Sequence, residues 1–112
     1  MKRSTLWLVA GLASICLVML LISPAVWADD SATVFKSKCA MCHGPDGKGE
    51  TPTGKAMKVS NLASDEVQKK TDAQLTETTT NGKNKMPAFK GKLTDEQIKD
   101  LVKFIRGLAK KS

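Results

Sequence analysis

The sequence predicts an all-α domain in residues 29–112, preceded by a targeting segment in residues 1–28. Helix-capping patterns recur along the domain, and the apolar residues near its carboxyl end follow helical spacing. No alternating strand pattern is present outside the targeting segment. A domain of this size with three phenylalanines as its only aromatic residues buries little apolar surface by itself. We therefore expect it to recruit a cofactor, a metal or another staple for its core.

The first 28 residues have the layout of a secretory signal peptide. Two basic residues precede a mostly apolar run over residues 6–22, and Val26 and Ala28 occupy the positions that determine cleavage. Cleavage after Ala28 would leave one exported domain, residues 29–112. The apolar run approaches the length of a membrane span, so an uncleaved amino-terminal anchor is the alternative.

The first helix of the domain is expected to begin with Asp30 or Ser31 as its cap and to run through Phe35 into a cysteine motif. Gly44-Pro45 should stop it. The following segment, residues 44–60, is rich in glycine and proline and is predicted to be a long loop. A loop of this length is uncommon in a compact domain unless it wraps a ligand, so we expect it to enclose the edge of a cofactor.

Two helical segments are predicted in the middle of the domain. Ser64 is expected to start a short one around Val67. The segment Thr71-Asp72-Ala73-Gln74 has the spacing of a capping box, and a modest helix should follow it to about Thr80. The next two residues, Asn81-Gly82, tolerate the left-handed conformation that ends many helices.

The last helix has the strongest pattern in the sequence. Thr94-Asp95-Glu96-Gln97 is a second capping box, with Leu93 and Ile98 placed for a hydrophobic staple. Apolar residues spaced by three and four positions predict one buried face, which consists of Ile98, Leu101, Val102, Ile105 and Leu108.

The segment Cys39-Ala40-Met41-Cys42-His43 has the C-x-x-C-H pattern of covalent haem attachment. On a helix, positions i, i+3 and i+4 share one face, so Cys39, Cys42 and His43 can all face one flat cofactor. The two thiols would become thioether bonds to the haem, and the imidazole of the chain's single histidine would ligate its iron.

Two other interpretations of the same segment are a thioredoxin-like dithiol and a structural zinc site. A thioredoxin motif lies near a βαβ pattern, and no convincing strand flanks this segment. Zinc normally takes four nitrogen or sulfur ligands, and outside the segment the chain offers only Cys16, which lies in the targeting segment. Both interpretations therefore fit this segment less well than haem attachment does.

A second axial ligand would decide between electron transfer and ligand binding. Met41 lies inside the motif and cannot reach the opposite face of the haem, while Met57 lies in the predicted long loop. Met86 lies in a loop between two predicted helices, and Pro87 biases it towards an extended conformation. We favour Met86 over Met57 because of its loop between two helices and the extension that Pro87 imposes; core filling is the alternative role, which its place outside any helical stripe disfavours.

The charge of the domain is basic but dispersed. Without the two basic residues of the targeting segment, 16 basic and 11 acidic residues give a formal charge of +5. No basic run alternates with aromatic residues, so nucleic-acid binding is not favoured. The lysines are expected to lie on a solvated face or to steer an acidic partner.

The chain resembles the small monohaem class I c-type cytochromes, especially the bacterial and photosynthetic short-chain kind. The resemblance lies in residues 34–44, in Asp46-Gly47-Lys48-Gly49, in residues 81–89 and in the last helix with its capping box. It implies a compact fold in which the first and last helices cross, here through Phe35 and Phe104, around one covalent haem c held by His43 and Met86.

Three positions depart from the family's pattern. Ser31 stands where many relatives have glycine, which suggests a slightly wider helix crossing. Ser60 stands where proline is common, in a segment whose carbonyl would orient the imidazole. Thr78 and Thr79 replace apolar residues and weaken the expected packing of the middle helix.

The function that this resemblance implies is that of a soluble carrier of single electrons, not an enzyme, exported to the periplasm or a compartment like the thylakoid lumen. Its partners would be redox proteins with an acidic docking surface, reached through lysines near the motif segments. Membrane attachment is expected only if the amino-terminal segment is uncleaved, and the carrier should be a monomer. The alternative is a haem enzyme or gas sensor, such as a small peroxidase, with an open sixth coordination position.

Overall fold

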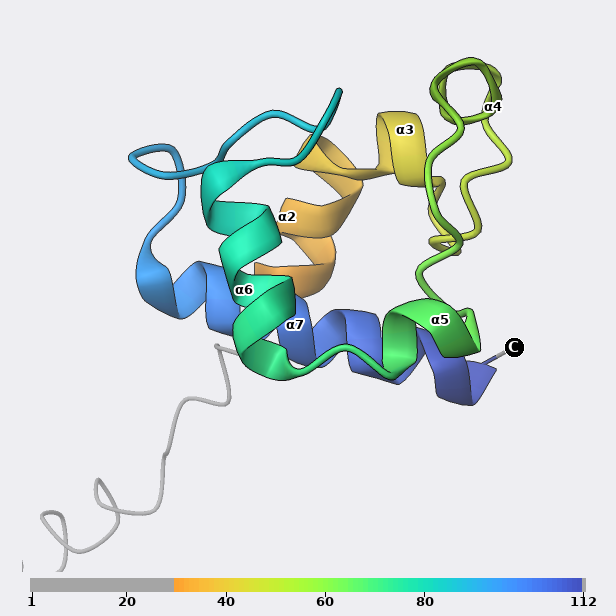
Figure 1. The fold of residues 1–112 in the computed structure, drawn as a ribbon. Helices are drawn as coiled ribbons and strands as arrows, with labels where there is room; N and C mark the ends of the chain where they lie inside the picture. Colours follow the sequence, from red (N-terminus) through yellow and green to blue (C-terminus); the bar gives the residue numbers. More distant parts are fainter. Residues whose placement is uncertain (1–29, 112) are drawn as a thin grey trace, which may run out of the picture.

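The computed structural model describes residues 30–111 of the chain. In this range six α-helices and one short 3-10 helix follow one another, with isolated bridges but no strand, which confirms the all-α expectation (Figure 1). The elements are α2 (Asp30–Lys38), α3 (Ala40–His43), α4 (Pro52–Met57), α5 (Asp65–Gln68), α6 (Asp72–Asn81), α7 (Asp95–Leu108) and η1 (Ala109–Lys111). The predicted signal peptide and its cleavage site lie outside the described residues.

Helix α7 is the element against which α2, α5 and α6 pack, whereas α3 and α4 pack on each other (Figure 1). All five residues of its predicted apolar face are buried. Four of them divide between two clusters: Val102 and Ile105 pack with residues of α5 and α6, whereas Leu101 and Leu108 pack with α2. Leu62, in the loop before α5, contacts both clusters, so the core is continuous across α7.

The crossing of the first and last helices occurs where it was expected. The rings of Phe35 in α2 and Phe104 in α7 lie 4.9 Å apart between centroids, with their planes inclined by 41°. Phe35 is 2% exposed, so this tilted aromatic pair lies at the centre of the α2–α7 contact. The substitution at Ser31 does not prevent it.

The caps predicted for the later helices are present. The hydroxyls of Thr71 and Thr94 each accept a hydrogen bond from the backbone amide three residues on, and the side-chain oxygens of Gln74 and Gln97 accept from the amides of the two cap residues. Ser64 caps α5 with a single bond, in which its hydroxyl accepts from the amide of Val67. These local bonds satisfy amide groups that would otherwise lack partners at the helix ends.

The threonines of α6 are accommodated by hydrogen bonds within the helix. Thr79 is buried, and its hydroxyl donates to the carbonyl of Leu75 at 2.9 Å. Thr80 makes the same bond to Thr76 at 2.7 Å. A buried hydroxyl that has a partner costs little, so α6 extends to Asn81 despite three consecutive β-branched residues.

Arg106 of α7 fixes the start of α6. Its guanidinium donates to the carbonyls of Gln68 and Lys70 and to the carboxylate of Asp72, which begins α6. The Gln68 amide in turn donates to the carbonyls of Leu62 and Ile105. Because these bonds reach backbone groups, they fix the path of the chain between α5 and α6 more firmly than a surface ion pair alone could.

Two expectations about the first half of the domain are corrected. The first helix does not run unbroken through the cysteine motif, because Cys39 forms a turn between α2 and α3. The predicted long loop contains a helix, α4, which Thr51 caps and Pro52 begins. Lys58 ends it in a left-handed conformation, at φ 55°.

Candidate functional site

The three residues of the C-x-x-C-H pattern lie on one short segment. Cys39 donates its backbone amide to the carbonyl of Phe35 at 2.9 Å, which ties the turn to α2. His43 donates its amide to the carbonyl of Cys39, also at 2.9 Å, so the segment keeps helical hydrogen bonding although α2 and α3 are separate. All three side chains are half-buried. Gly44, at φ 77°, then ends the segment in a conformation that favours glycine.

Helix α4 supports this segment from the other side. The Thr51 hydroxyl donates to the carbonyls of Met41 and Cys42, at 2.8 and 3.0 Å, and accepts from the amide of Gly54 at 2.9 Å. A Cβ on Gly54 would lie 2.2 Å from the Cys42 carbonyl oxygen, so only glycine permits this approach. Sequence reasoning missed Thr51 and Gly54; the Thr-Pro pair that begins α4 was the one available signal.

The imidazole of His43 is neutral at physiological pH. Burial lowers its pKa below the usual range, and the Ser60 carbonyl, which faces the ring, opposes part of this effect. Nδ1 is nevertheless a buried atom without a hydrogen bond of normal geometry. A neutral imidazole is the form that binds a metal, and a nearby backbone carbonyl is the usual group that orients it. The segment containing Ser60 therefore lies where it was expected.

Cys39 lacks the character of a reactive thiol in a redox dithiol. Burial, followed by the charge of the adjacent Cys42, raises the pKa of the Cys39 thiol to about 11. Reactive dithiols of the thioredoxin kind instead have a cysteine whose pKa lies below that of a free thiol. The thioredoxin-like interpretation is therefore disfavoured by the surroundings of Cys39, as well as by the lack of a nearby strand.

Met86 lies in a tight turn that follows α6. Lys83 and Met86 exchange two backbone hydrogen bonds, at 3.2 and 2.9 Å, and Asn84 between them adopts a left-handed conformation at φ 54°. The far side of the loop returns to α6, where the amide of Phe89 donates to the carbonyl of Thr79 at 3.1 Å. Since Phe89 is buried, both ends of the segment that carries Met86 are fixed.

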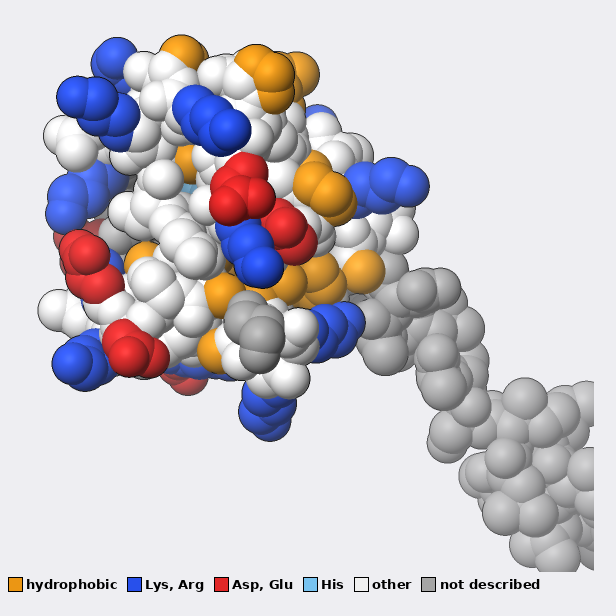
Figure 2. Space-filling view, turned by 90° about the vertical axis from the view of Figure 1, so that its right-hand side faces the viewer, with side chains coloured by type: hydrophobic (Ala, Val, Ile, Leu, Met, Phe, Trp, Pro, Cys, Tyr) orange, Lys and Arg blue, Asp and Glu red, His pale blue; other side chains and the backbone are white. Residues whose placement is uncertain are grey.

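The other two methionines within residues 30–111 have less restricted surroundings. Met41 is 77% exposed and Met57, at the end of α4, is 41% exposed, whereas Met86 is half-buried. Figure 2 shows the face that carries α3 and α4, where apolar side chains border basic side chains in the upper part and acidic side chains lie in the middle and lower parts.

The site and the fold together define a c-type cytochrome. A protein-family model described as "Cytochrome C oxidase, cbb3-type, subunit III" matches residues 28–105. The solved structure titled "KustC0563 c-type cytochrome" has a TM-score of 0.66 and 34% sequence identity, and the match covers 70% of this chain and 96% of that chain.

Curated relatives give the same result. The cytochrome c6 of Nostoc sp. (strain PCC 7120 / SAG 25.82 / UTEX 2576) is 38% identical over 89 residues, which cover 78% of each chain. The cytochrome c6 of Leptolyngbya boryana is 37% identical over 78 residues, which cover 70% of this chain and 88% of the relative. The chain therefore belongs to the cytochrome c family.

This membership confirms the resemblance seen in the sequence. The chain is an electron-transfer cytochrome with covalently bound haem c, and the alternative of a haem enzyme or gas sensor is not favoured. The residues present fit the cofactor: a neutral imidazole with an unpartnered buried nitrogen lies beside two thiols on one segment.

The Met86 turn depends on the absence of a side chain at Gly82. Gly82 has φ 74° and ψ 170°, a region that essentially only glycine occupies, and a Cβ there would lie 2.6 Å from the Met86 carbonyl oxygen. We expect Gly82→Ala to lower the free energy of unfolding by at least about 1–3 kcal/mol, because strain and collision combine. Urea unfolding of the holoprotein measures this change.

Gly91→Ala is the matched control. Gly91 also has a positive φ, 78°, but a Cβ there would meet no atom within 4 Å. Gly91→Ala should lower the free energy of unfolding only by the strain of placing a side chain on a left-handed backbone, about 1–2 kcal/mol. Equal losses in the two variants would show that the close approach to Met86 contributes nothing.

Proposed function

We propose that Cys39 and Cys42 form the thioether bonds to haem c and that His43 and Met86 are the axial ligands of its iron. The surroundings of His43 carry this proposal, since burial keeps its imidazole neutral and a backbone carbonyl faces the ring. The haem supplies an iron that alternates between Fe(II) and Fe(III). With both axial positions held by the chain, the site favours electron transfer over binding of an external ligand.

The structural support for Met86 is the rigidity of its segment. Two hydrogen bonds close the turn before it, and Phe89 fixes the chain after it. A ligand held in this way moves little when the iron changes charge, which keeps reorganisation small. A thioether also favours the reduced iron and raises the reduction potential. Met57 is the weaker candidate, because it lies at the exposed end of α4.

Carbon monoxide tests the ligand set. We expect reduced wild type to bind it poorly and Met86→Ala to bind it readily, because removing the thioether opens the sixth position. The weak sulfur-to-iron absorption band should disappear from the same variant. The matched control is Met57→Ala, which should behave like wild type in both measurements. Rapid binding by wild type, or loss of the band in Met57→Ala alone, would refute the assignment of Met86.

We further propose that the domain is exported as a soluble monomer after cleavage behind Ala28, to the periplasm or a lumen-like compartment. The layout of residues 1–28 supports export, and within residues 30–111 no helix is both long and apolar enough to cross a membrane. Intact-mass measurement of the mature holoprotein should give residues 29–112 plus one haem. A mass that includes residues 1–28 would instead support the amino-terminal anchor.

For the partners, we propose redox proteins that present an acidic docking surface. Five exposed lysines lie near the motif segments in the sequence and would steer such a partner: Lys38, Lys48, Lys83, Lys85 and Lys90. Exposed charges of this kind change the rate of encounter more than the strength of binding.

The salt dependence of electron transfer tests this steering. Lys85→Glu should slow the second-order reaction with an acidic redox protein at low ionic strength and flatten its dependence on salt. Lys99→Glu in α7 makes the same change in net charge at another exposed lysine, and it should have a smaller effect. Equal effects of the two variants would mean that only the net charge matters.

A further inference from the structure

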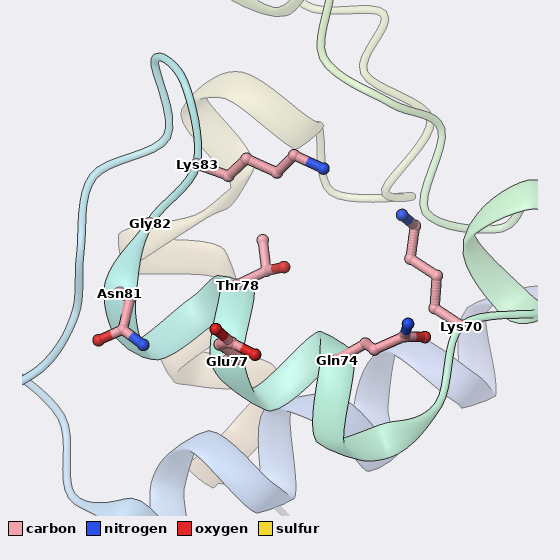
Figure 3. A pocket seen from close by; sticks show the side chains of 7 residues that line it. All are labelled: Lys70, Gln74, Glu77, Thr78, Asn81, Gly82 and Lys83. Atoms are coloured by element: carbon pink, nitrogen blue, oxygen red, sulfur yellow. The ribbon is translucent and has the colours of Figure 1, made fainter.

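A pocket of about 280 Å³, lined by polar and charged residues and one glycine, lies along α6 (Figure 3). Its lining contains no apolar side chain. Lys70 precedes α6, Gln74 and Thr78 lie on the helix one turn apart, and Lys83 follows it. A pocket with this lining suits a charged or strongly polar group.

The two lysines enter the pocket from opposite ends of the helix. Figure 3 shows the ammonium groups of Lys70 and Lys83 pointing towards the same space, with Thr78 directed into it between them. Among residues 30–111 the ion pairs are Lys103 with Asp100 and Arg106 with Asp72, so neither pocket lysine is held by one. Two ammonium groups that share a space repel each other, and an anion between them would turn this repulsion into attraction.

The backbone fixes both lysines in place. Arg106 holds the carbonyl of Lys70, and Lys83 forms the turn with Met86 through two hydrogen bonds. The positions from which the side chains extend are therefore set by the fold, although the side chains themselves are long. A pair of lysines anchored in this way is better suited to hold an anion than two lysines on mobile loops.

The pocket adjoins the proposed ligand loop. Gly82 and Lys83 line it, and the same two residues pack against the Met86 backbone. An anionic group in the pocket would thus lie next to the segment that carries the proposed axial thioether. Haem c brings such groups with it, because its porphyrin carries two propionates.

We propose that Lys70 and Lys83 bind the haem propionates, with the side chains of Gln74 and Thr78 as hydrogen-bonding partners. This inference rests on the proposed function. The lysines keep the propionates ionised and position the haem edge along α6. Their positive charge also favours the reduced iron, so they contribute to the reduction potential.

One carboxylate opposes the two lysines. Glu77 also lines the pocket, and with Lys70 and Lys83 it completes the titratable side chains that face it. Its negative charge favours the oxidised iron and the protonated propionate. Variants of Lys70 and Glu77 should therefore change the same two quantities in opposite directions.

The test uses the ferric and ferrous holoprotein. In Lys70→Gln, the proton affinity of a haem propionate should rise about tenfold, measured from the pH dependence of its methylene proton resonances in the ferric state. The midpoint potential should fall in the same variant and rise in Glu77→Gln. Lys99→Gln removes one charge from an exposed position of α7 and should leave the propionate unchanged. Lys70→Arg keeps the charge and should resemble wild type.

Three results would overturn the proposal. The first is an equal fall in potential for Lys70→Gln and Lys99→Gln with no change at the propionates. The second is a wild-type potential that responds to inorganic phosphate at constant ionic strength, since a free anion would then occupy the pocket. The third is a rise in the proton affinity of the propionate in Lys70→Arg as large as that in Lys70→Gln, since the charge kept by arginine would then play no part. Each result leaves the proposed ligand set intact if the variants keep covalent haem and the sulfur-to-iron band.

Discussion

The packing of two sets of apolar residues on α7 is the interaction on which the whole site depends. One side of this helix holds α2, which leads directly into the C-x-x-C-H segment, through Phe35, Leu101 and Phe104. The other side holds α6, which leads into the Met86 turn, through Leu75 and Val102. The proposed ligands come from chain segments 43 residues apart, and α7 is the common support of both.

Rigidity near the proposed ligands comes from backbone hydrogen bonds more than from buried apolar surface. Thr51 and Gly54 hold α4 against the carbonyl of Cys42, and the Met86 turn is closed by bonds between Lys83 and Met86. An electron carrier gains from such a design, because ligands that keep their positions in both oxidation states lower the reorganisation that accompanies each transfer. The small apolar core can then be completed by the cofactor.

The sequence predicted the features that have local causes. The capping boxes at Thr71 and Thr94 involve neighbouring residues only. The apolar residues of α7 follow a helical period that can be recognised in the sequence alone. Helix α4 was missed because it has a glycine and no apolar stripe, and contacts with the distant Cys42 hold it. The burial of Thr79 was unexpected because its bond to the Leu75 carbonyl depends on the helix already being formed.

The lysine pocket could not have been found from the sequence, since spacing alone does not bring Lys70 and Lys83 together. Ten residues of α6 separate their anchoring points by about 15 Å, from the rise of 1.5 Å per residue. Their long side chains reach the same pocket only because the Arg106 contacts and the Met86 turn set where the chain enters and leaves the helix. The charges near the proposed haem edge are thus fixed by the same contacts that fix the proposed ligand loop. A change in either contact should therefore alter the reduction potential even when all four proposed attachment and ligand residues are intact.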